Sequence, residues 1–335
     1  MLKKGYKNSI IIHKNMEGKK YKYKFTLFTP CYCSAKFIDR IKETLDRQTF
    51  RDFEWIVVND ASPDNTSEVL QEYIKTADFP VKFFDLKQNQ MLAANWNLAV
   101  EHAEGEIFVI LGHDDIYLPN MLKTFNELYE KYNSEKIGGI IARCETQLGK
   151  ITPAEFPKPI MSYWEYGVDK NGRNGGEAPC AWKTDVLRKY MPFDPKELIN
   201  PLIGALMSCD GYGFIMTNEV VRKYYVYEDG GFSLSKNRKK YSLWGYRSAL
   251  RQINLFSPHY YMSPKAKYDL CVQYAMFSIR NNVSFIDSIK ALKRFKGLVI
   301  VAYPMAYLRV NLANVTPIYN LYIWLQKKKQ NITKA

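Results

Sequence analysis

Short apolar runs alternate with amphipathic segments along residues 25–131, and this alternation restricts the possible folds more than any other feature. The apolar runs have the length of strands and stop at polar or turn-forming residues; they are Phe25–Phe28, Glu54–Val58, Val81–Phe84 and Ile107–Leu111. The segments between them have helical spacing, at Phe37–Gln48, Thr66–Lys75, Met91–Ala103 and Asn120–Lys131. Such an alternation predicts an α/β fold, a mostly parallel sheet covered by helices on both faces.

Polar residues follow three of these predicted strands. Thr29 comes after the first, Asn59-Asp60 after the second, and His113-Asp114-Asp115 after the strand ending at Leu111. Ligands of parallel α/β sheets bind beyond the carboxyl ends of the strands. We therefore expect these residues to converge on one site at one edge of the sheet.

Asp114 and Asp115 are adjacent carboxylates that repel each other, and such a pair is usually neutralised by a cation or by hydrogen-bond donors. Mg²⁺ typically binds through one or two carboxylates plus substrate phosphates. The alternative is a turn in which an Asp caps the helix expected at Asn120. His113 is interpreted as a local structural residue rather than a metal ligand.

The second polar cluster runs from Asn59 to Thr66. Asp60 has the chemistry to accept a hydrogen bond from the N–H of a nucleotide base. Asp64 and Thr66 have the spacing of a cap and first turn for the following helix. We expect a ligand role for Asp60 and a capping role for Asp64.

Taken in order, five stretches of the chain resemble the inverting nucleotide-sugar glycosyltransferases of family 2 that build polysaccharides or glycolipids. They are Thr29-Pro30-Cys31-Tyr32, Val57 to Thr66, Asn89 to Asn97, Glu101 to Glu106, and Leu111-Gly112-His113-Asp114-Asp115. The resemblance covers residues 24–135 well and 136–235 more weakly. It implies a GT-A fold, a Rossmann-like and mostly parallel sheet flanked by helices.

The resemblance also implies a nucleoside-diphosphate sugar donor, most often a uridine nucleotide, with Mn²⁺ or Mg²⁺. It assigns Asp115 to the metal, Trp182 and Lys183 to an acceptor or sugar pocket, and a larger set to the nucleotide: Thr29, Pro30, Tyr32, Asp60, Ser62, Asn89 and Asp114. The family often has Asp where this chain has Gly112. That departure motivates an alternative, a catalytically silent sugar-nucleotide-binding protein.

Attack by an acceptor hydroxyl requires a general base, and Asp210 is the first candidate. The resemblance places this base ahead of a helix, about 20 residues before a Gly-Ser segment, and the run Gly211–Met216 is interpreted as the start of that helix. The alternatives are Glu228 and Asp229, beside Gly230-Gly231. A further possibility is that Asp210 only caps a helix.

We expect three parts in the chain: a basic lead-in at 1–23, a domain at 24–235, and a helical basic region at 236–335. The resemblance implies that the domain is catalytic, with a nucleotide-binding half (24–135) and an acceptor half (136–235). The last of the three parts holds 18 Lys or Arg and only two acids, Asp269 and Asp287. Such a balance suits nucleic acid, an anionic membrane surface or an anionic substrate. No nucleic-acid-binding motif is present, so we expect no nucleic-acid partner. We expect either an interfacial helix on anionic lipid, close to a lipid-linked saccharide acceptor, or a helical lid.

Composition excludes several classes of protein. Apolar residues make up 47% and charged residues 24%, which is typical of a globular protein rather than a disordered or fibrous chain. No stretch reaches the roughly 18 apolar residues of a membrane span, and Ser9–Ile12 is too short for a signal-peptide core. Six scattered cysteines in a chain of this size indicate reduced thiols. We expect a cytoplasmic protein, attached to the inner face of the cell membrane if the basic region binds lipid. Nothing in the sequence specifies the oligomeric state.

Overall fold

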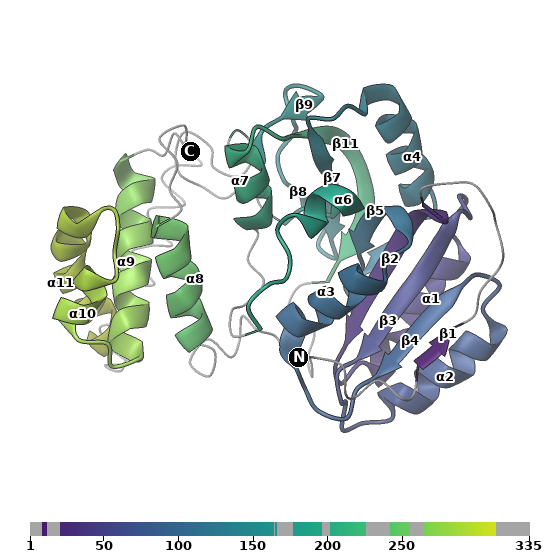
Figure 1. Cartoon of the computed structure of the whole chain (residues 1–335), viewed down its shortest axis with the longest axis horizontal. Coiled ribbons are helices and arrows are strands. Elements are labelled where there is room, and N and C mark those ends of the chain that lie inside the picture. Colours follow the sequence, from purple (N-terminus) through teal and green to yellow (C-terminus); the bar gives the residue numbers. More distant parts are fainter. Residues whose placement is uncertain are drawn as a thin grey trace. The chain divides into compact units, whose positions relative to one another are not determined.

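A computed structural model describes residues 9–11, 21–163, 165, 177–195, 202–225, 242–254 and 264–312. The described residues form two compact units, one ending at Tyr225 and the other beginning at Ser242. The first unit is built on a single sheet, and the second consists of helices (Figure 1).

The sheet has the strand order β1-β4-β3-β2-β5-β10-β7-β11-β6, with β8 paired to β7 and β9 paired to β11. The strand bounds are β1 Ser9–Ile11, β2 Tyr23–Cys31, β3 Phe53–Asn59, β4 Val81–Asp85, β5 Gly105–Ile110, β6 Ile116–Tyr117, β7 Ile137–Thr146, β8 Ile151–Thr152, β9 Ile160–Met161, β10 Cys180–Lys183 and β11 Gly213–Tyr224. Strands β4, β3, β2 and β5 are parallel, β10 is antiparallel to both of its neighbours, and β7 and β11 are parallel to each other. The predicted, mostly parallel α/β sheet is confirmed.

Helices cover both faces of this sheet because each contributes an apolar stripe to one of two buried cores. The helix bounds are η1 Ala35–Phe37, α1 Ile38–Asp46, α2 Thr66–Thr76, α3 Met91–His102, α4 Met121–Tyr132, α6 Thr184–Arg188 and α7 Leu202–Cys209. One core contains side chains of α1, α2 and α4, and the other contains side chains of α3, α6 and α7. Figure 1 shows α3 crossing one face while α1 and α2 lie on the other.

Three elements differ from the sequence-based expectation. Ser9–Ile11, within the expected lead-in, forms β1 and pairs with β4 at one edge of the sheet. The short strand β10 inserts antiparallel between β5 and β7. Residues 213–216 begin the strand β11 and not a helix, while the helix in this region, α7, lies before Asp210.

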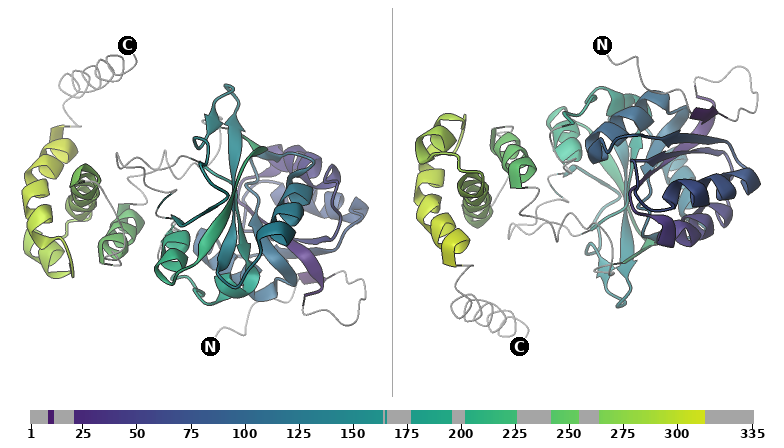
Figure 2. Two further views of the ribbon diagram at one scale, coloured as in Figure 1. Left: turned by 90° about the horizontal axis from the view of Figure 1, so that it is seen from above. Right: turned by 90° about the horizontal axis from the view of Figure 1, so that it is seen from below.

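The second unit contains four helices among its described residues: α8 Ser242–Asn254, α9 Pro264–Arg280, α10 Phe285–Lys290 and α11 Lys296–Leu312. Helix α9 packs against α8 and α11 (Figure 2), and Tyr246 stacks on Tyr274 with ring centroids 5.5 Å apart. The predicted helical C-terminal region is confirmed. Within the described part of the chain, none of the helices has both the length and the apolar character needed to cross a bilayer.

Candidate active site

The carboxyl ends of β2, β3 and β5 lie side by side. The backbone amide of Asp60 donates to the Cys31 carbonyl at 2.8 Å, and that of Leu111 donates to the Phe28 carbonyl at 2.8 Å. His113 Nδ1 lies 3.1 Å from the Pro30 carbonyl oxygen. The loops that follow the three strands therefore meet at one edge of the sheet, which places Asp60 and the Asp114-Asp115 pair together as predicted.

Gly112 leaves the space into which the two carboxylates point. A Cβ atom built on Gly112 would lie 3.0 Å from Asp115 Oδ2 and 3.2 Å from Asp114 Oδ1. Both oxygen atoms therefore approach one point beside the backbone. An aspartate at position 112 would crowd this pair, which gives a local physical reason for glycine where the family often has an acid.

Asp115 is buried, with 3% of its surface exposed. Its Oδ1 atom accepts a hydrogen bond from the Tyr225 amide at 3.1 Å, and its Oδ2 atom lies 3.3 Å from Arg222 Nη1. Burial raises the pKa of Asp115 to about 7, against the lowering effect of Arg222 and with a further rise from the Asp114 charge.

Arg222, on β11, organises the charges around Asp115. Its side chain is 7% exposed, and its Nη2 atom donates to Glu177 Oε1 at 2.7 Å. Its Nη1 atom lies 3.4 Å from the Tyr117 hydroxyl, and its Nε atom is buried without a hydrogen-bond partner among the described residues. The pKa of Arg222 is raised despite its burial because Tyr117, Asp115 and Glu177 favour the charged guanidinium. Arg222 was not predicted from the sequence, since an isolated Arg in a strand carries no local signal of its partners.

The acid pair fits a hard divalent cation. Magnesium-type sites use one or two protein carboxylates and take further oxygen ligands from substrate phosphates, and Asp114 Oδ1 and Asp115 Oδ2 converge at Gly112. Within the described ranges no group of three or more His, Cys, Asp or Glu residues gathers at a metal-binding distance. A cation at the acid pair would thus need ligands from a bound diphosphate.

Asp60 caps the start of α3. Its two carboxylate oxygens accept hydrogen bonds from the backbone amides of Gln90 (2.7 Å) and Met91 (2.9 Å), and 4% of the residue is exposed. Burial raises the pKa of Asp60. Asn89 is exposed, and its Oδ1 atom accepts a hydrogen bond from the same Met91 amide at 3.2 Å. To bind the N–H of a nucleotide base, the Asp60 carboxylate would therefore have to accept that hydrogen bond in addition to, or in place of, those from the two backbone amides.

Three non-glycine residues at this edge adopt positive φ angles. They are Cys33 after β2 (52°), Ala61 after β3 (55°) and Met91 at the start of α3 (70°). Such conformations cost on the order of 1–3 kcal/mol each and cluster at functional sites. Their gathering in three loops of one edge supports a binding role for that edge.

Side-chain hydrogen bonds join the same loops. Ser62 Oγ accepts from the Cys33 amide at 3.0 Å and donates to Asn59 Oδ1 at 2.5 Å. The Tyr32 amide donates to Ser34 Oγ at 3.0 Å. Pro30, Tyr32 and Ser62 are half-buried at the edge where the sequence analysis expected nucleotide contacts.

Arg40, on α1, is a second residue that the sequence analysis missed. Its Nη1 atom donates to the Asp114 carbonyl oxygen at 2.5 Å, and its guanidinium stacks 3.9 Å from the centroid of the Tyr225 ring. Arg40 thereby links the acid-pair loop to the residue that follows β11. Its place beside the buried Ile41 could be found from helical spacing, but its partners could not.

The structure does not place the Thr29 side chain where a nucleotide contact was expected. Its side chain is fully buried, and its hydroxyl accepts a hydrogen bond from Trp55 Nε1 at 3.0 Å. Successive strand residues alternate between faces, so Thr29 follows Phe25 and Leu27 into the core. Its side chain does not face the edge where Asp60 and the acid pair lie.

The structure also does not place Trp182 and Lys183 at the edge where an acceptor or sugar pocket was expected. Trp182 is 5% exposed and packs edge-to-face on Phe214, with ring centroids 5.8 Å apart. Lys183 pairs with Ile107 near the beginning of β5 and donates to Asn133 Oδ1 at 3.1 Å. Because the acid pair follows the other end of β5, Lys183 lies at the opposite edge of the sheet.

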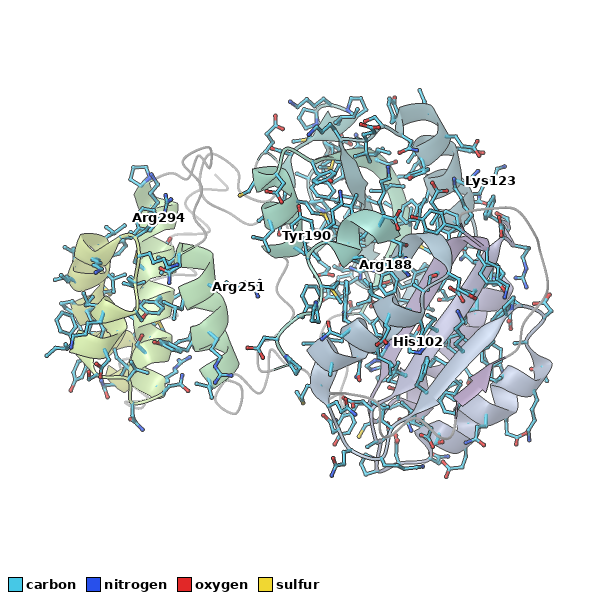
Figure 3. All side chains as sticks on the ribbon, viewed as in Figure 1. His102, Lys123, Arg188, Tyr190, Arg251 and Arg294 are labelled. Carbon is cyan, nitrogen blue, oxygen red and sulfur yellow. The ribbon has the colours of Figure 1, made fainter. Side chains whose placement is uncertain are left out.

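Asp210 lies at that opposite edge as well. It follows α7 and precedes β11, whose first residue pairs with Ile137 at the beginning of β7. Its Oδ2 atom accepts from the Tyr190 hydroxyl at 2.5 Å (Figure 3 labels Tyr190). Strand β11 separates Asp210 from Tyr225, which touches Asp115. With its register shifts β11 runs beside β7 from Ile137 to Thr146, and ten strand residues span roughly 30 Å. The structure therefore places Asp210 far from the acid pair. The alternatives Glu228 and Asp229 lie outside the described residues.

Comparison with known proteins identifies the domain that carries this edge. The model of glycosyl transferase family 2 matches residues 26–190, which include the loops after β2, β3 and β5. Residues 26–190 belong to glycosyltransferase family 2. The family named from the sequence resemblance is thus confirmed.

Curated relatives of this glycosyltransferase domain share part of their length with the chain. A teichoic acid poly(glycerol phosphate) polymerase of Staphylococcus epidermidis is 34% identical over 119 residues, 36% of this chain and 16% of that protein. An uncharacterized glycosyltransferase of Nostoc is 26% identical over 211 residues, 60% of this chain and 64% of that protein. The chain spans only these fractions of the relatives' lengths.

Solved glycosyltransferase structures share the fold. Residues 1–349 of Staphylococcus aureus TarS in complex with UDP-GlcNAc superpose with a TM-score of 0.55 at 17% identity, covering 86% of this chain and 81% of that one. A mannosyltransferase of Pyrobaculum calidifontis in complex with GDP-Man and Mn²⁺ gives a TM-score of 0.52 at 19% identity, with the same coverage. The predicted GT-A fold is confirmed.

Proposed function

We propose that the protein transfers a sugar from a nucleoside-diphosphate donor, uridine-linked in the first instance, to a saccharide or a lipid-linked saccharide. The observation that carries this proposal is the convergence of Asp114 and Asp115 at Gly112, on the edge that also holds Asp60. Acidic side chains beside strained backbone loops suit a metal-bound diphosphate. Two of the structural relatives are described as complexes with UDP-GlcNAc and GDP-Man.

Asp114 and Asp115 are the residues that would hold Mn²⁺ or Mg²⁺, which when bound supplies a Lewis acid for the charge that develops on a leaving diphosphate. Arg222 places a fixed positive charge 3.3 Å from Asp115. The guanidinium offsets part of the cost of burying the Asp115 carboxylate. It also helps to orient Asp115 beside Gly112.

Glu228 and Asp229 are the candidates for the general base. The Tyr225 amide is 3.1 Å from Asp115 Oδ1, and three further residues of chain span at most about 11 Å. The chain length between Tyr225 and Glu228 therefore permits Glu228 to reach the acid pair. A base there would deprotonate the acceptor hydroxyl for a single in-line displacement, which inverts the anomeric centre.

A catalytically silent nucleotide-sugar binder is the second candidate function, and Gly112 is the feature that favours it. The position holds no third acid, and the two neighbouring carboxylates fill its space. Such a protein would bind the donor with metal but release neither free nor transferred sugar. Donor hydrolysis and transfer, measured beside donor binding, separate the two functions.

Binding of UDP with Mn²⁺ gives the first test. We expect the pair together to raise the melting temperature of the protein by several degrees, since a ligand at about 100 times its Kd adds roughly 2.7 kcal/mol to the free energy of unfolding and each kcal/mol is worth about 2–4 °C. Asp115→Asn is expected to abolish the shift. Asp39→Asn, whose carboxylate is 98% exposed on α1, is the matched control and should keep it. No shift in the wild-type protein would contradict the proposal.

The raised pKa of Asp115 gives a pH test. A cation needs the ionised carboxylate, so protons compete with Mn²⁺ once the pH falls below the Asp115 pKa of about 7. We expect the apparent Kd for Mn²⁺ in the presence of UDP to rise up to about tenfold per pH unit below 7. Calorimetry, corrected for the Mn²⁺–UDP complex in protein-free buffer, measures it. A constant Kd across this range would exclude Asp115 as a ligand.

A further inference from the structure

Helix α11 has apolar side chains on both of its faces. Val299, Ala302 and Ala306 are buried and face inward, in a unit where α11 packs on α9. The opposite face is exposed over Ile300, Val301, Met305, Tyr307 and Leu308, which are 39–66% exposed. A helix that is apolar all round is normally buried, so this outward face lacks an apolar environment among the described residues of the unit.

Helix α10 extends the same exposed apolar surface. Phe285 is 43% exposed and packs edge-to-face on Tyr303, with ring centroids 4.8 Å apart; Ile286 is 62% exposed. A hollow of about 460 Å³ opens between the two helices, lined by Phe285, Ile300, Tyr303, Pro304, Tyr307 and Leu308. The exposed apolar residues of α10 and α11, together with the lining of this hollow, are called the α10–α11 face. Isolated exposed apolar residues are common, but contiguous ones mark an interaction surface.

Cationic residues border the α10–α11 face. Lys290, Lys293, Arg294 and Lys296 lie within seven residues, from the end of α10 to the beginning of α11, and all four are exposed; Figure 3 labels Arg294. The described part of this unit contains only two acids, Asp269 and Asp287, against ten Lys or Arg. A symmetric contact between two copies would bring these like charges together. An anionic partner complements them.

We propose that the α10–α11 face inserts into the interface of an anionic lipid bilayer, with the four cations at the headgroups. An exposed apolar helix face beside cations, as α11 presents, is typical of helices that lie in the interfacial plane. The hollow beside Pro304 offers an apolar space to lipid acyl chains. This inference concerns a separate surface and does not depend on the proposed transferase activity.

Flotation of the full chain with lipid vesicles tests the proposal. We expect binding to phosphatidylcholine vesicles that contain about a third phosphatidylglycerol, weak binding to phosphatidylcholine alone, and a loss of binding at high salt. Replacing Lys290, Lys293, Arg294 and Lys296 by Gln should lower the partition coefficient on the order of 1,000-fold, because each cation near an anionic surface is worth about 1 kcal/mol. Ile286→Gln, Val301→Gln and Leu308→Gln together should lower it at least about tenfold.

Leu148→Gln is the matched control for the apolar variant, since Leu148 is 89% exposed in the first unit; it should bind like the wild type. Hydrogen exchange of residues 285–312 should slow in the presence of anionic vesicles. Three results would overturn the proposal: no wild-type binding, equal binding by the apolar variant, or a wild-type dimer that Val301→Gln dissociates. The last result would assign the face to a second copy of the chain. Circular dichroism of each variant confirms that it is folded.

Discussion

Glu228→Gln or Asp229→Asn is expected to lower sugar transfer by about 10²–10⁴-fold, the usual contribution of a general base, whereas Asp210→Asn is expected to leave transfer within a few-fold of wild type. The reason is the direction of β11. Its first residues lie at the edge that holds Asp210, and its last residues lead to Tyr225, which contacts Asp115. Of the two ends of β11, only the C-terminal end lies on the side of the acid pair.

The measurement is turnover of a panel of sugar nucleotides with Mn²⁺ and a saccharide acceptor, with UDP binding followed in parallel. A base variant should lose turnover while it keeps its affinity for UDP, because the base contacts the acceptor and not the donor. Inactive Asp210→Asn with intact UDP affinity, beside active variants at 228 and 229, would return the role to Asp210. Loss of activity together with loss of UDP affinity would indicate a binding role instead.

The elements that the sequence predicted well are those with long apolar periodicity. The helices expected at Phe37–Gln48 and Asn120–Lys131 are present as α1 and α4, and the strands ending at Phe28 and Leu111 are present as β2 and β5. The edge of the site followed from them, because parallel strands deliver their polar ends to one side. The position of Asp60 and the Asp114-Asp115 pair at that edge could therefore be predicted from the sequence, while their roles remain predictions.

The residues that were misplaced depended on short runs or on side-chain direction. The run Gly211–Met216 is too short to distinguish a strand from a buried helix, and that ambiguity placed Asp210 ahead of a helix. Thr29 was assigned to the ligand although alternation from Phe25 and Leu27 directs it inward. Trp182 lies on β10, which inserts antiparallel between β5 and β7. No local sequence pattern predicts such an insertion.

The network around Asp115 could not be predicted for a different reason. Its members Tyr117, Glu177 and Arg222 are far apart in the sequence and meet only because β11 pairs with β6 and β7. Register of this kind is set by the whole sheet. A single sequence therefore shows which acidic residues follow a strand, but not which basic side chain pairs with them.

Replacing Arg222 is expected to destabilise the first unit strongly. Arg222→Met should lower the free energy of unfolding by about 3–5 kcal/mol, because it leaves a buried carboxylate without its partner. Asp115 carries most of this cost, since its side chain is 4% exposed while that of Glu177 is 45% exposed. Arg47→Met, which breaks the exposed pair with Glu43 on α1, is the control and should cost at most about 0.5 kcal/mol.

The pH dependence of this loss distinguishes charge from packing. The pKa of Asp115 in the folded protein, about 7, lies above the ordinary aspartate value of 3.8, so its contribution to stability is present at low pH and is lost as the pH rises through 7. Without Arg222 this pKa rises further. The cost of Arg222→Met, followed by urea unfolding, should therefore be larger at pH 8 than at pH 6. Adding Asp115→Asn should recover part of it, since the amide leaves no buried charge. A cost that is independent of pH and unchanged by Asp115→Asn would mean that Arg222 acts through packing alone, and the acid pair would then owe its position to the backbone at Gly112.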